Sequence, residues 1–303
     1  MNDVILNGDS KRRRLRRLLE NLAWSAANQL AMGGLCAWRL EEPNLMIARH
    51  SMALEGLHED WHGAKIAHVA DLHLGPLTTE SYLGEFIERI NEFEPDFVTV
   101  AGDIITGPRT YARAAGRLLR RLRPRVASLA IMGNHDYGLF HPTGWGRTRG
   151  LAEYLAGQLA DAGLHVLLNT SQTYSRGRGL LQFVGLEDLW SQRMDARAAF
   201  ARVRTDVPAI ALCHNPDAAP ELAQRGAQWV LAGHTHGKSS PTGGIHDRLL
   251  PVMYRQFVAG YYALDEGRHL YVNRGLGHSR RTDANSRPEI TIFTLCGGQP
   301  RPA

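Results

Sequence analysis

Residues 65–73 read KIAHVADLH, residues 97–103 read FVTVAGD and residues 126–136 read VASLAIMGNHD. Each stretch begins with an apolar run that is too short for a typical helix, and it ends on acidic, imidazole or amide side chains. Segments with helical character separate the three stretches, so we expect an α/β fold with largely buried strands. Loops that leave the carboxyl ends of such strands converge on one edge of the sheet. The sequence therefore predicts that these polar side chains meet there.

The same alternation of short apolar runs and helical segments continues along the chain. Strands are predicted at residues 65–70, 97–101, 126–132, 180–185, 209–213 and 229–232. Helices are predicted at residues 79–93, 111–121, 147–162, 196–202 and 217–225, the last opened by Asn215-Pro216-Asp217 as a capping signal. Three later strands, at 261–264, 269–272 and 290–295, have no helices between them, so we expect an antiparallel meander or a second sheet.

Five clusters of metal-ligating residue types follow predicted strands: Asp71-Leu72-His73, Gly102-Asp103, Gly133-Asn134-His135-Asp136, His214-Asn215 and Gly233-His234-Thr235-His236. Carboxylate, imidazole and amide oxygen donors suit divalent ions such as Mn²⁺, Fe²⁺ or Zn²⁺. Cys36, Cys213 and Cys296 lie far apart without a CxxC pair, which argues against a disulfide framework and a thiolate zinc site. We therefore expect two divalent ions bridged by one carboxylate, with a hydroxide held between them for attack on phosphorus.

In this order, the motifs D-x-H, G-D, G-N-H-D, H-N and G-H-T-H resemble those of the calcineurin-like metallophosphoesterases over about residues 65–295. The resemblance implies a four-layer αββα sandwich, in which two packed mixed β-sheets are flanked by helices. It implies these metal ligands: Asp71, His73 and His236 for the first ion, Asp103 as the bridge, and Asn134, His214 and His234 for the second ion. It also implies that His135 is the catalytic histidine, which stabilises the transition state and can protonate the leaving oxygen, and that Asp136 orients its ring.

Stretches in the second half of the chain narrow the resemblance. Residues 184–190, 213–217, 233–237, 271–277 and 287–290 are similar to a bacterial membrane-associated phosphodiesterase group that includes UDP-2,3-diacylglucosamine hydrolases of lipid A assembly. Cys213 stands where this group commonly has serine, and Lys238 stands where a second glycine is usual, but neither change removes a predicted ligand. The resemblance implies a hydrolase that cleaves a phosphodiester or pyrophosphate bond, on an amphipathic or lipid-linked substrate such as UDP-2,3-diacylglucosamine.

The amino-terminal segment has a different character from the rest. Much of the formal net charge of +5 comes from residues 11–17, and below this cationic front apolar residues recur at helical spacing: Leu15, Leu18, Leu19, Leu22, Ala26 and Leu30. The stretch is too polar for a bilayer span but fits an interfacial amphipathic helix. We therefore expect residues 1–60 to be a basic amphipathic membrane-surface anchor and residues 61–298 to be the catalytic domain.

We expect residues 11–38 to contact an anionic membrane surface, at the cytoplasmic face of the bacterial inner membrane. Arg16-Arg17 leaves twin-arginine export to the cell envelope as an alternative, and a basic helix end packed on the body as another.

Two rival functions stay open. The first is a nuclease or a general phosphodiesterase that acts on soluble substrates. Arginines concentrate in residues 113–125 without interleaved aromatic residues, so we do not expect a nucleic-acid partner. The second is a noncatalytic membrane-surface scaffold, which the intact ligand set disfavours because buried carboxylates and imidazoles are costly without a metal. No obligate protein partner is predicted. Asp188 and Arg274 are weaker candidates for the rim of the site, and Gly275 and Gly277 are interpreted as turn residues.

Overall fold

The computed structural model describes residues 45–140, 146–237, 253–254, 256–265, 267–277 and 287–298, and these residues form two mixed six-stranded sheets. The strands of the first sheet lie in the order β1 (Met46–Leu54), β12 (Glu289–Gly297), β2 (Lys65–Val69), β3 (Phe97–Ala101), β4 (Ala127–Ile131) and β5 (His165–Val166). Those of the second lie in the order β10 (Gly260–Asp265), β11 (Arg268–Val272), β9 (Trp229–Ala232), β8 (Ala209–Leu212), β7 (Gly179–Gly185) and β6 (Thr170–Arg176).

Neighbouring strands in the middle of each sheet run parallel, which fixes where their loops emerge. Strands β2, β3, β4 and β5 are parallel to one another, and so are β7, β8, β9 and β11. The antiparallel pairs are β12 with β2, β10 with β11, and β6 with β7. The loops after β2, β3 and β4 therefore leave one edge of the first sheet, and those after β8 and β9 leave one edge of the second.

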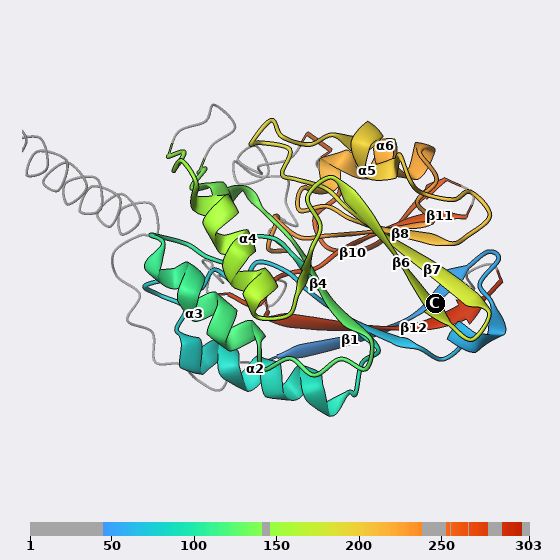
Figure 1. Cartoon of the computed structure of the whole chain (residues 1–303), viewed down its shortest axis with the longest axis horizontal. Coiled ribbons are helices and arrows are strands. Elements are labelled where there is room, and N and C mark those ends of the chain that lie inside the picture. Colours follow the sequence, from blue (N-terminus) through green and yellow to red (C-terminus); the bar gives the residue numbers. More distant parts are fainter. Residues whose placement is uncertain are drawn as a thin grey trace, which may run out of the picture. The chain divides into compact units, whose positions relative to one another are not determined.

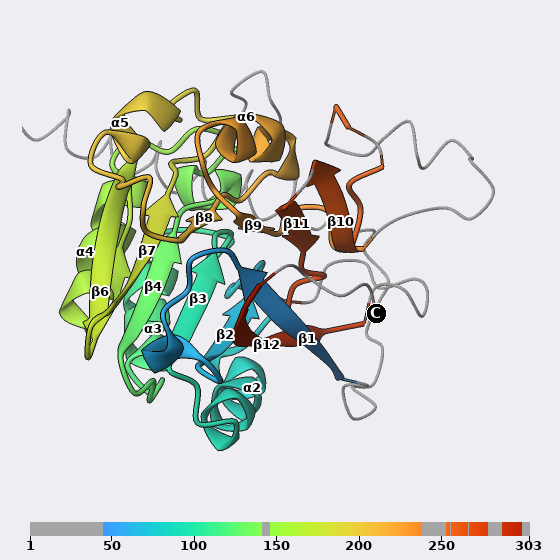
Figure 2. The ribbon, with the colours of Figure 1, turned by 90° about the vertical axis from the view of Figure 1, so that its right-hand side faces the viewer.

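Helices cover the outer face of each sheet (Figure 1). Helices α2 (Glu80–Glu92), α3 (Thr110–Leu119) and α4 (Leu151–Asp161) pack on the first sheet, whereas α5 (Ala196–Phe200) and α6 (Ala219–Gln224) pack on the second (Figure 2). Thr79 begins α2 because its side chain accepts a hydrogen bond from the backbone N of Tyr82 at 3.2 Å. These layers confirm the predicted αββα sandwich.

Alternation along β3 shows why both faces of the first sheet are apolar. Val98 and Val100 pack against α2 and α3, whereas Phe97 and Ala101 face the second sheet. Three buried apolar clusters result, one between the two sheets and one under each helical layer. Apolar runs without alternating polar residues are typical of strands that are covered on both faces.

The last three strands agree only in part with the antiparallel meander or second sheet that the sequence predicts. Strands β10 and β11 do pair antiparallel in the second sheet, but β11 also pairs parallel with β9. Strand β12 crosses to the first sheet, where it lies between β1 and β2. Its apolar faces are buried there by partners distant in sequence, which local patterning does not encode. The capping signal at Asn215 is confirmed, although one 3₁₀ turn, Pro216–Ala218, precedes α6.

Strands β1, β5 and β6 are absent from the predicted set. Strand β6 reads TSQTYSR and is largely exposed because it lies at a sheet edge. Strand β1 pairs in parallel with β12, so Met46–Leu54 belongs to the first sheet. The predicted anchor in residues 11–38 lies outside the described residues, as does Lys238. Within the described ranges, no helix has the length and apolar character needed to cross a membrane.

Candidate metal centre

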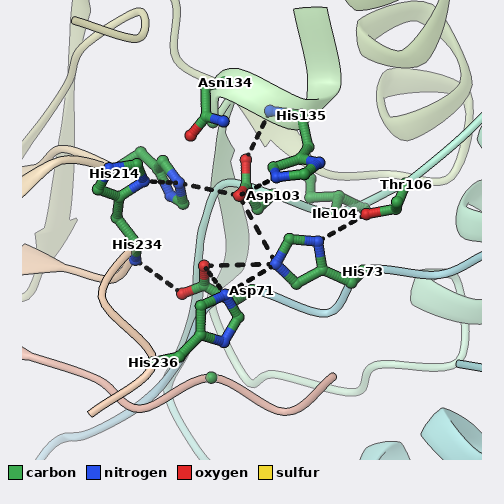
Figure 3. A network of polar contacts seen from close by, with 12 residues as sticks. Asp71, His73, Asp103, Ile104, Thr106, Asn134, His135, His214, His234 and His236 are labelled. Atoms are coloured by element: carbon green, nitrogen blue, oxygen red, sulfur yellow. Dashed lines mark hydrogen bonds and ion pairs between the residues drawn. The ribbon is translucent and has the colours of Figure 1, made fainter. Parts of the chain in front are cut away.

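Five loops bring carboxylate, imidazole and amide side chains together (Figure 3). Asp71 and His73 follow β2, Asp103 follows β3, and the segment 134–136 follows β4. His214 follows β8, and His234 and His236 follow β9, so both sheets contribute. Potential ligand atoms lie within 4.8 Å of one another in three groups: Asp71, His73 and His236; His73, Asp103 and His135; and Asp103, His214 and His234.

The Oδ2 atom of Asp103 lies at the middle of the cluster. It is 3.2 Å from Nε2 of His214, 3.6 Å from Nε2 of His73 and 3.9 Å from Nε2 of His135. The other oxygen, Oδ1, accepts a hydrogen bond from the backbone N of His135 at 2.9 Å. One oxygen therefore fixes the carboxylate to the β4 loop and leaves the other facing imidazoles from both sheets.

Asp71 occupies a similar position in the first group. Its Oδ2 accepts a hydrogen bond from the backbone N of His234 at 2.9 Å, and its Oδ1 lies 3.3 Å from Nε2 of His236. Nε2 of His73 and Nε2 of His236 are only 3.0 Å apart. The contact is a hydrogen bond when one Nε2 carries a proton, and displacement of that proton would leave both nitrogens free to coordinate a cation.

The backbone of the site is strained. Eight non-glycine residues in the described segments have positive φ, and five of them are candidate ligands: Asp71, His73, Asp103, His234 and His236. Each residue in this conformation costs about 1–3 kcal/mol unless it is a glycine, and such costs concentrate at functional sites. The backbone conformation that directs these five side chains toward the cluster therefore lowers the stability of the fold.

Contacts outside the cluster orient two of the histidines. Nδ1 of His73 lies 2.6 Å from Oγ1 of Thr106, and Nδ1 of His214 lies 2.8 Å from the carbonyl oxygen of Ala101. When Nδ1 donates its proton to these oxygens, Nε2 of each ring is left with a lone pair that points at the carboxylates. The sequence around Thr106 does not indicate that it contacts His73, because Thr106 follows β3 whereas His73 follows β2.

The structure gives Asp136 a different role from the predicted one. Its Oδ1 accepts hydrogen bonds from the backbone N of Ile104 and of Ile105, and its Oδ2 accepts from the backbone N of Gly133. No hydrogen bond joins it to the ring of His135 in the described part of the chain, and Nδ1 of His135 is buried without a partner there. Asp136 thus ties the loops after β3 and β4 together, and the prediction that it orients the His135 ring is wrong. The ring instead packs edge-on against Phe140 and His73.

Charges within the cluster shift the ionisation of its members. Burial opposes ionisation of Asp103, but His214, His135 and His73 outweigh it and hold the pKa of that carboxyl well below its usual value. Burial alone would lower the pKa of His214, but its ion pair with Asp103 raises that pKa to about 10. His135 has its pKa lowered to about 4 by burial, although Asp103 opposes this. A metal ion that binds His214 must displace its proton.

These residues fit divalent metal ions. Oδ1 of Asp71 and Oδ1 of Asn134 are buried and accept no hydrogen bond from any described residue. The amide nitrogen of Asn134 donates to the carbonyl oxygen of Leu139 at 2.8 Å, which fixes the orientation of the amide. Buried oxygens that accept no hydrogen bond cost free energy that coordination of a cation would recover. The combination of carboxylate, imidazole and amide donors without a thiolate is typical of Mn²⁺, Fe²⁺ or Zn²⁺ sites.

Thr106→Val is expected to weaken metal binding by ~10–100-fold, because the ring of His73 loses the hydroxyl that orients it. Titration calorimetry with Mn²⁺ measures the change. Thr106→Ser keeps the hydroxyl and should bind Mn²⁺ as the unchanged protein does. Equal affinities for all three proteins would show that Thr106 does not support the site.

The two weaker candidates, Asp188 and Arg274, each form contacts of their own. Oδ2 of Asp188 accepts from the backbone N of Ser191 at 2.6 Å and so caps a turn, and burial raises the pKa of Asp188 to about 6. Arg274 donates to Oε2 of the buried Glu289 at 2.6 Å. An aromatic residue that the sequence did not single out, Trp190, stacks edge-on against His234 with ring centroids 4.7 Å apart.

Comparisons with known proteins find similarity over most of the chain. The sequence model described as "Calcineurin-like phosphoesterase" matches residues 64–238. The metallophosphoesterase YkuE of Bacillus subtilis (strain 168) is 32% identical, over 94% of this chain and 97% of the relative. The phosphodiesterase YaeI of Escherichia coli (strain K12) is 29% identical, over 76% and 82%. The UDP-2,3-diacylglucosamine pyrophosphatase LpxG of Chlamydia trachomatis serovar D is 27% identical, over 90% and 92%.

Proposed function

Because this chain belongs to the calcineurin-like phosphoesterase family, we propose that it hydrolyses a phosphodiester or pyrophosphate bond in an amphipathic, lipid-linked substrate. The protein is a metal-dependent phosphoesterase, and its candidate ligand groups are those described above. The observation that carries the proposal is the position of Asp103, whose Oδ2 faces histidines from both sheets.

The proposed ligands divide between two ions. Asp71, His73 and His236 would hold the first, Asn134, His214 and His234 would hold the second, and Asp103 would hold both. When bound, the ions would supply Lewis-acid activation of water and neutralise charge on the phosphoryl oxygens. His214 would be kept in place by the carbonyl oxygen of Ala101, and Asn134 by that of Leu139.

His135 would act on the leaving group. Its side chain keeps 23% of its surface exposed, whereas that of Asp103 keeps 3%, so the imidazole can reach a bound substrate. Its Nε2 is on the side of Asp103, 3.9 Å from Oδ2. Burial lowers the pKa of His135 to about 4, so the ring takes up a proton only when the negative charge of a bound phosphoryl group raises that pKa. The protonated ring can then donate to the leaving oxygen and hydrogen-bond to a phosphoryl oxygen.

Two observations support a lipid-linked substrate such as UDP-2,3-diacylglucosamine. LpxG, which is similar along nearly its whole length, is named for the pyrophosphatase reaction on that compound. The basic and apolar pattern of residues 11–38 favours delivery at an anionic membrane surface, which we propose to be the cytoplasmic face of the inner membrane. YaeI, at similar identity, is named a phosphodiesterase, so simpler diesters are a second substrate class to test.

The arginines of the segment 113–125 do not favour a nuclease. Four of them form ion pairs with carboxylates on or beside α2: Arg117 with Glu80, Arg121 and Arg123 with Glu88, and Arg125 with Glu94. Their charge is therefore partly neutralised within the protein, which weakens attraction for a phosphate backbone.

The test is hydrolysis by protein loaded with Mn²⁺, measured on a nucleotide-linked diacyl sugar, a cyclic nucleotide and bis(p-nitrophenyl) phosphate. We expect turnover of the lipid-linked substrate to be highest and to fall to background after dialysis against EDTA. Saturation at 100 times Kd adds about 2.7 kcal/mol of stability, so EDTA should also lower Tm. Absence of Mn²⁺ binding, or of hydrolysis of every substrate, would contradict the proposed function.

Delivery at the membrane is tested separately by deleting the residues before Glu41. We expect this deletion to reduce turnover of the lipid-linked substrate in vesicles and to leave turnover of the soluble diester unchanged. Equal retention of both activities would remove support for the interfacial anchor.

A further inference from the structure

The first ligand group is built across the gap between the two sheets. Asp71 and His73 follow β2 of the first sheet, whereas His236 follows β9 of the second. Nε2 of His73 and Nε2 of His236 are 3.0 Å apart, so a small shift of one sheet against the other would separate them. Contacts near the ends of β2 and β9 must therefore fix the position of one sheet relative to the other.

We propose that Asn273 is the positioning residue that holds the two halves of this group together. It lies directly after β11, and it is fully buried. Its backbone N donates to the carbonyl oxygen of Ala232, the last residue of β9, at 2.9 Å. Its Nδ2 donates to Oγ1 of Thr291 on β12 at 2.9 Å and to the carbonyl oxygen of His68 on β2 at 3.3 Å. One residue therefore joins the second sheet to two strands of the first.

The same side chain shapes the loop that touches Asp71. Oδ1 of Asn273 accepts from the backbone N of Gly275 at 2.8 Å. The next two backbone N–H groups donate to the β2 end: that of Leu276 to the carbonyl oxygen of Ala70 at 3.1 Å, and that of Gly277 to the carbonyl oxygen of Asp71 at 2.8 Å. The loop thus forms hydrogen bonds with the peptide groups on both sides of Asp71.

This close approach explains both glycines of the loop. Gly275 has φ +79°, and a Cβ on it would lie 2.6 Å from Cβ of Asp71. A Cβ on Gly277 would lie 2.4 Å from the carbonyl oxygen of Leu72. Both distances are too short for any side chain, so these glycines permit contact with the metal loop as well as forming a turn.

The direction of the hydrogen bonds requires an amide at position 273. Oγ1 of Thr291 donates to Oε1 of Glu289 at 2.6 Å, so it can only accept from Asn273. Glu289 is fully buried, and it also accepts from the hydroxyl of Tyr271 and from Arg274, each at 2.6 Å. An aspartate at 273 could not donate and would place a second buried negative charge beside Glu289, which is costly.

His68 forms a second link in the same place. It is fully buried on β2, with Nδ1 2.9 Å from Oγ1 of Thr99 and Nε2 3.3 Å from the carbonyl oxygen of Ala232. Asn273 and His68 thus meet on one carbonyl group, that of the residue before Gly233, from which the His234 and His236 loop begins. These hydrogen bonds therefore fix Ala232 at the end of β9 in the second sheet and Asp71 after β2 in the first sheet.

The inference rests on the proposed metal site, and the experiment separates the two. Asn273→Leu has a similar shape and removes every side-chain hydrogen bond at this position. Thr291→Val removes one acceptor and Thr291→Ser keeps it. The matched control is Trp229→Phe, because Nε1 of Trp229 on β9 donates to the carbonyl oxygen of Ala53 on β1 at 2.9 Å, a buried link between the sheets at the opposite end of β9. Mn²⁺ stoichiometry and affinity are measured by calorimetry, spin coupling of the bound Mn²⁺ by electron paramagnetic resonance, and Tm by circular dichroism.

We expect Asn273→Leu to weaken one of two Mn²⁺ sites by ~10–100-fold and to abolish the spin-coupled signal, whereas the other site keeps its affinity. Thr291→Val should show a smaller loss of the same site and Thr291→Ser should restore it. Trp229→Phe should lower Tm but bind both ions normally. Wild-type affinity at both sites in folded Asn273→Leu, or equal metal loss in Trp229→Phe, would overturn the role of Asn273. If Asn273→Leu does not fold, unaltered binding in Thr291→Val overturns it. Failure of the unchanged protein to bind Mn²⁺ would instead overturn the proposed function.

Discussion

Asp103→Asn is expected to lower kcat by on the order of 10³-fold or more, equivalent to about 4 kcal/mol of transition-state stabilisation, and to prevent simultaneous binding of two Mn²⁺ ions. The asparagine oxygen can still accept from the backbone N of His135, as Oδ1 of Asp103 does at 2.9 Å. The amide nitrogen then replaces Oδ2, the atom that faces His73, His135 and His214. A donor cannot coordinate cations, so the change removes the shared ligand while the loop keeps its position.

Asp96→Asn provides the matched control. Asp96 precedes β3 and Asp103 follows it, and both carboxylates are buried. Asp96 accepts from the backbone N of Lys65 at 2.7 Å and from Arg176, at the opposite end of the strand from the candidate site. We expect Asp96→Asn to lower Tm and to leave kcat and metal content unchanged. If Asp103→Asn lowered kcat no more than Asp96→Asn does, a bridging role for Asp103 would be excluded.

Much of the site could be predicted because its information is local. Each proposed ligand lies within four residues of the end of a strand, and parallel strands place their carboxyl ends at one edge of a sheet. Asp103, His214 and His234, which follow β3, β8 and β9, therefore meet in the structure as their strand positions predict. The central strands could be predicted equally well, because a strand that is buried on both faces has an uninterrupted apolar run.

What could not be predicted depends on contacts between distant segments. Strand β12 has the same apolar character whether it follows β11 in a meander or crosses to β2, so pairing decides the outcome. The family resemblance implied that Asp136 orients the ring of His135, but three backbone N–H groups donate to its carboxylate instead. Asn273 reaches His68, 205 positions earlier in the chain, and no local pattern marks that partnership.

Five of the proposed ligands have a backbone with positive φ, and metal binding would offset the cost of that conformation. Chelated donors would offset the cost of their backbone conformation and of the unsatisfied Oδ1 atoms of Asp71 and Asn134. Asp136 accepts from backbone N–H groups of the loops after β3 and β4. Asn273 donates to the carbonyl oxygens of Ala232 and His68, near the ends of β9 and β2 from which two ligand loops begin. The rigid frame therefore comes from residues that do not themselves face the proposed ions.

His135→Gln is expected to separate metal binding from proton donation. Glutamine keeps a polar side chain of similar length but cannot carry the proton, so kcat for a diester with a poor, alkoxide leaving group should fall by ~10²–10⁴-fold. Loss should be at least tenfold smaller with bis(p-nitrophenyl) phosphate, whose leaving group needs no proton. Metal content should stay the same, since His135 is not among the proposed ligands.

The geometry leaves one competing role for His135, and the same variant decides it. Nε2 of His135 lies 3.9 Å from Oδ2 of Asp103 and belongs to a group with His73 in which all three could hold an ion. If His135 were a ligand, His135→Gln would lose an ion, and both substrates would be affected equally. Its side chain is the more exposed, at 23% against 10% for His73, and its ring contacts Phe140 as well as His73. A group held by ring packing alone, with no hydrogen bond to Nδ1 from the described residues, can turn toward a substrate, whereas the hydroxyl of Thr106 fixes His73 against its carboxylates. We therefore expect a loss that depends on the leaving group and leaves the metal content unchanged.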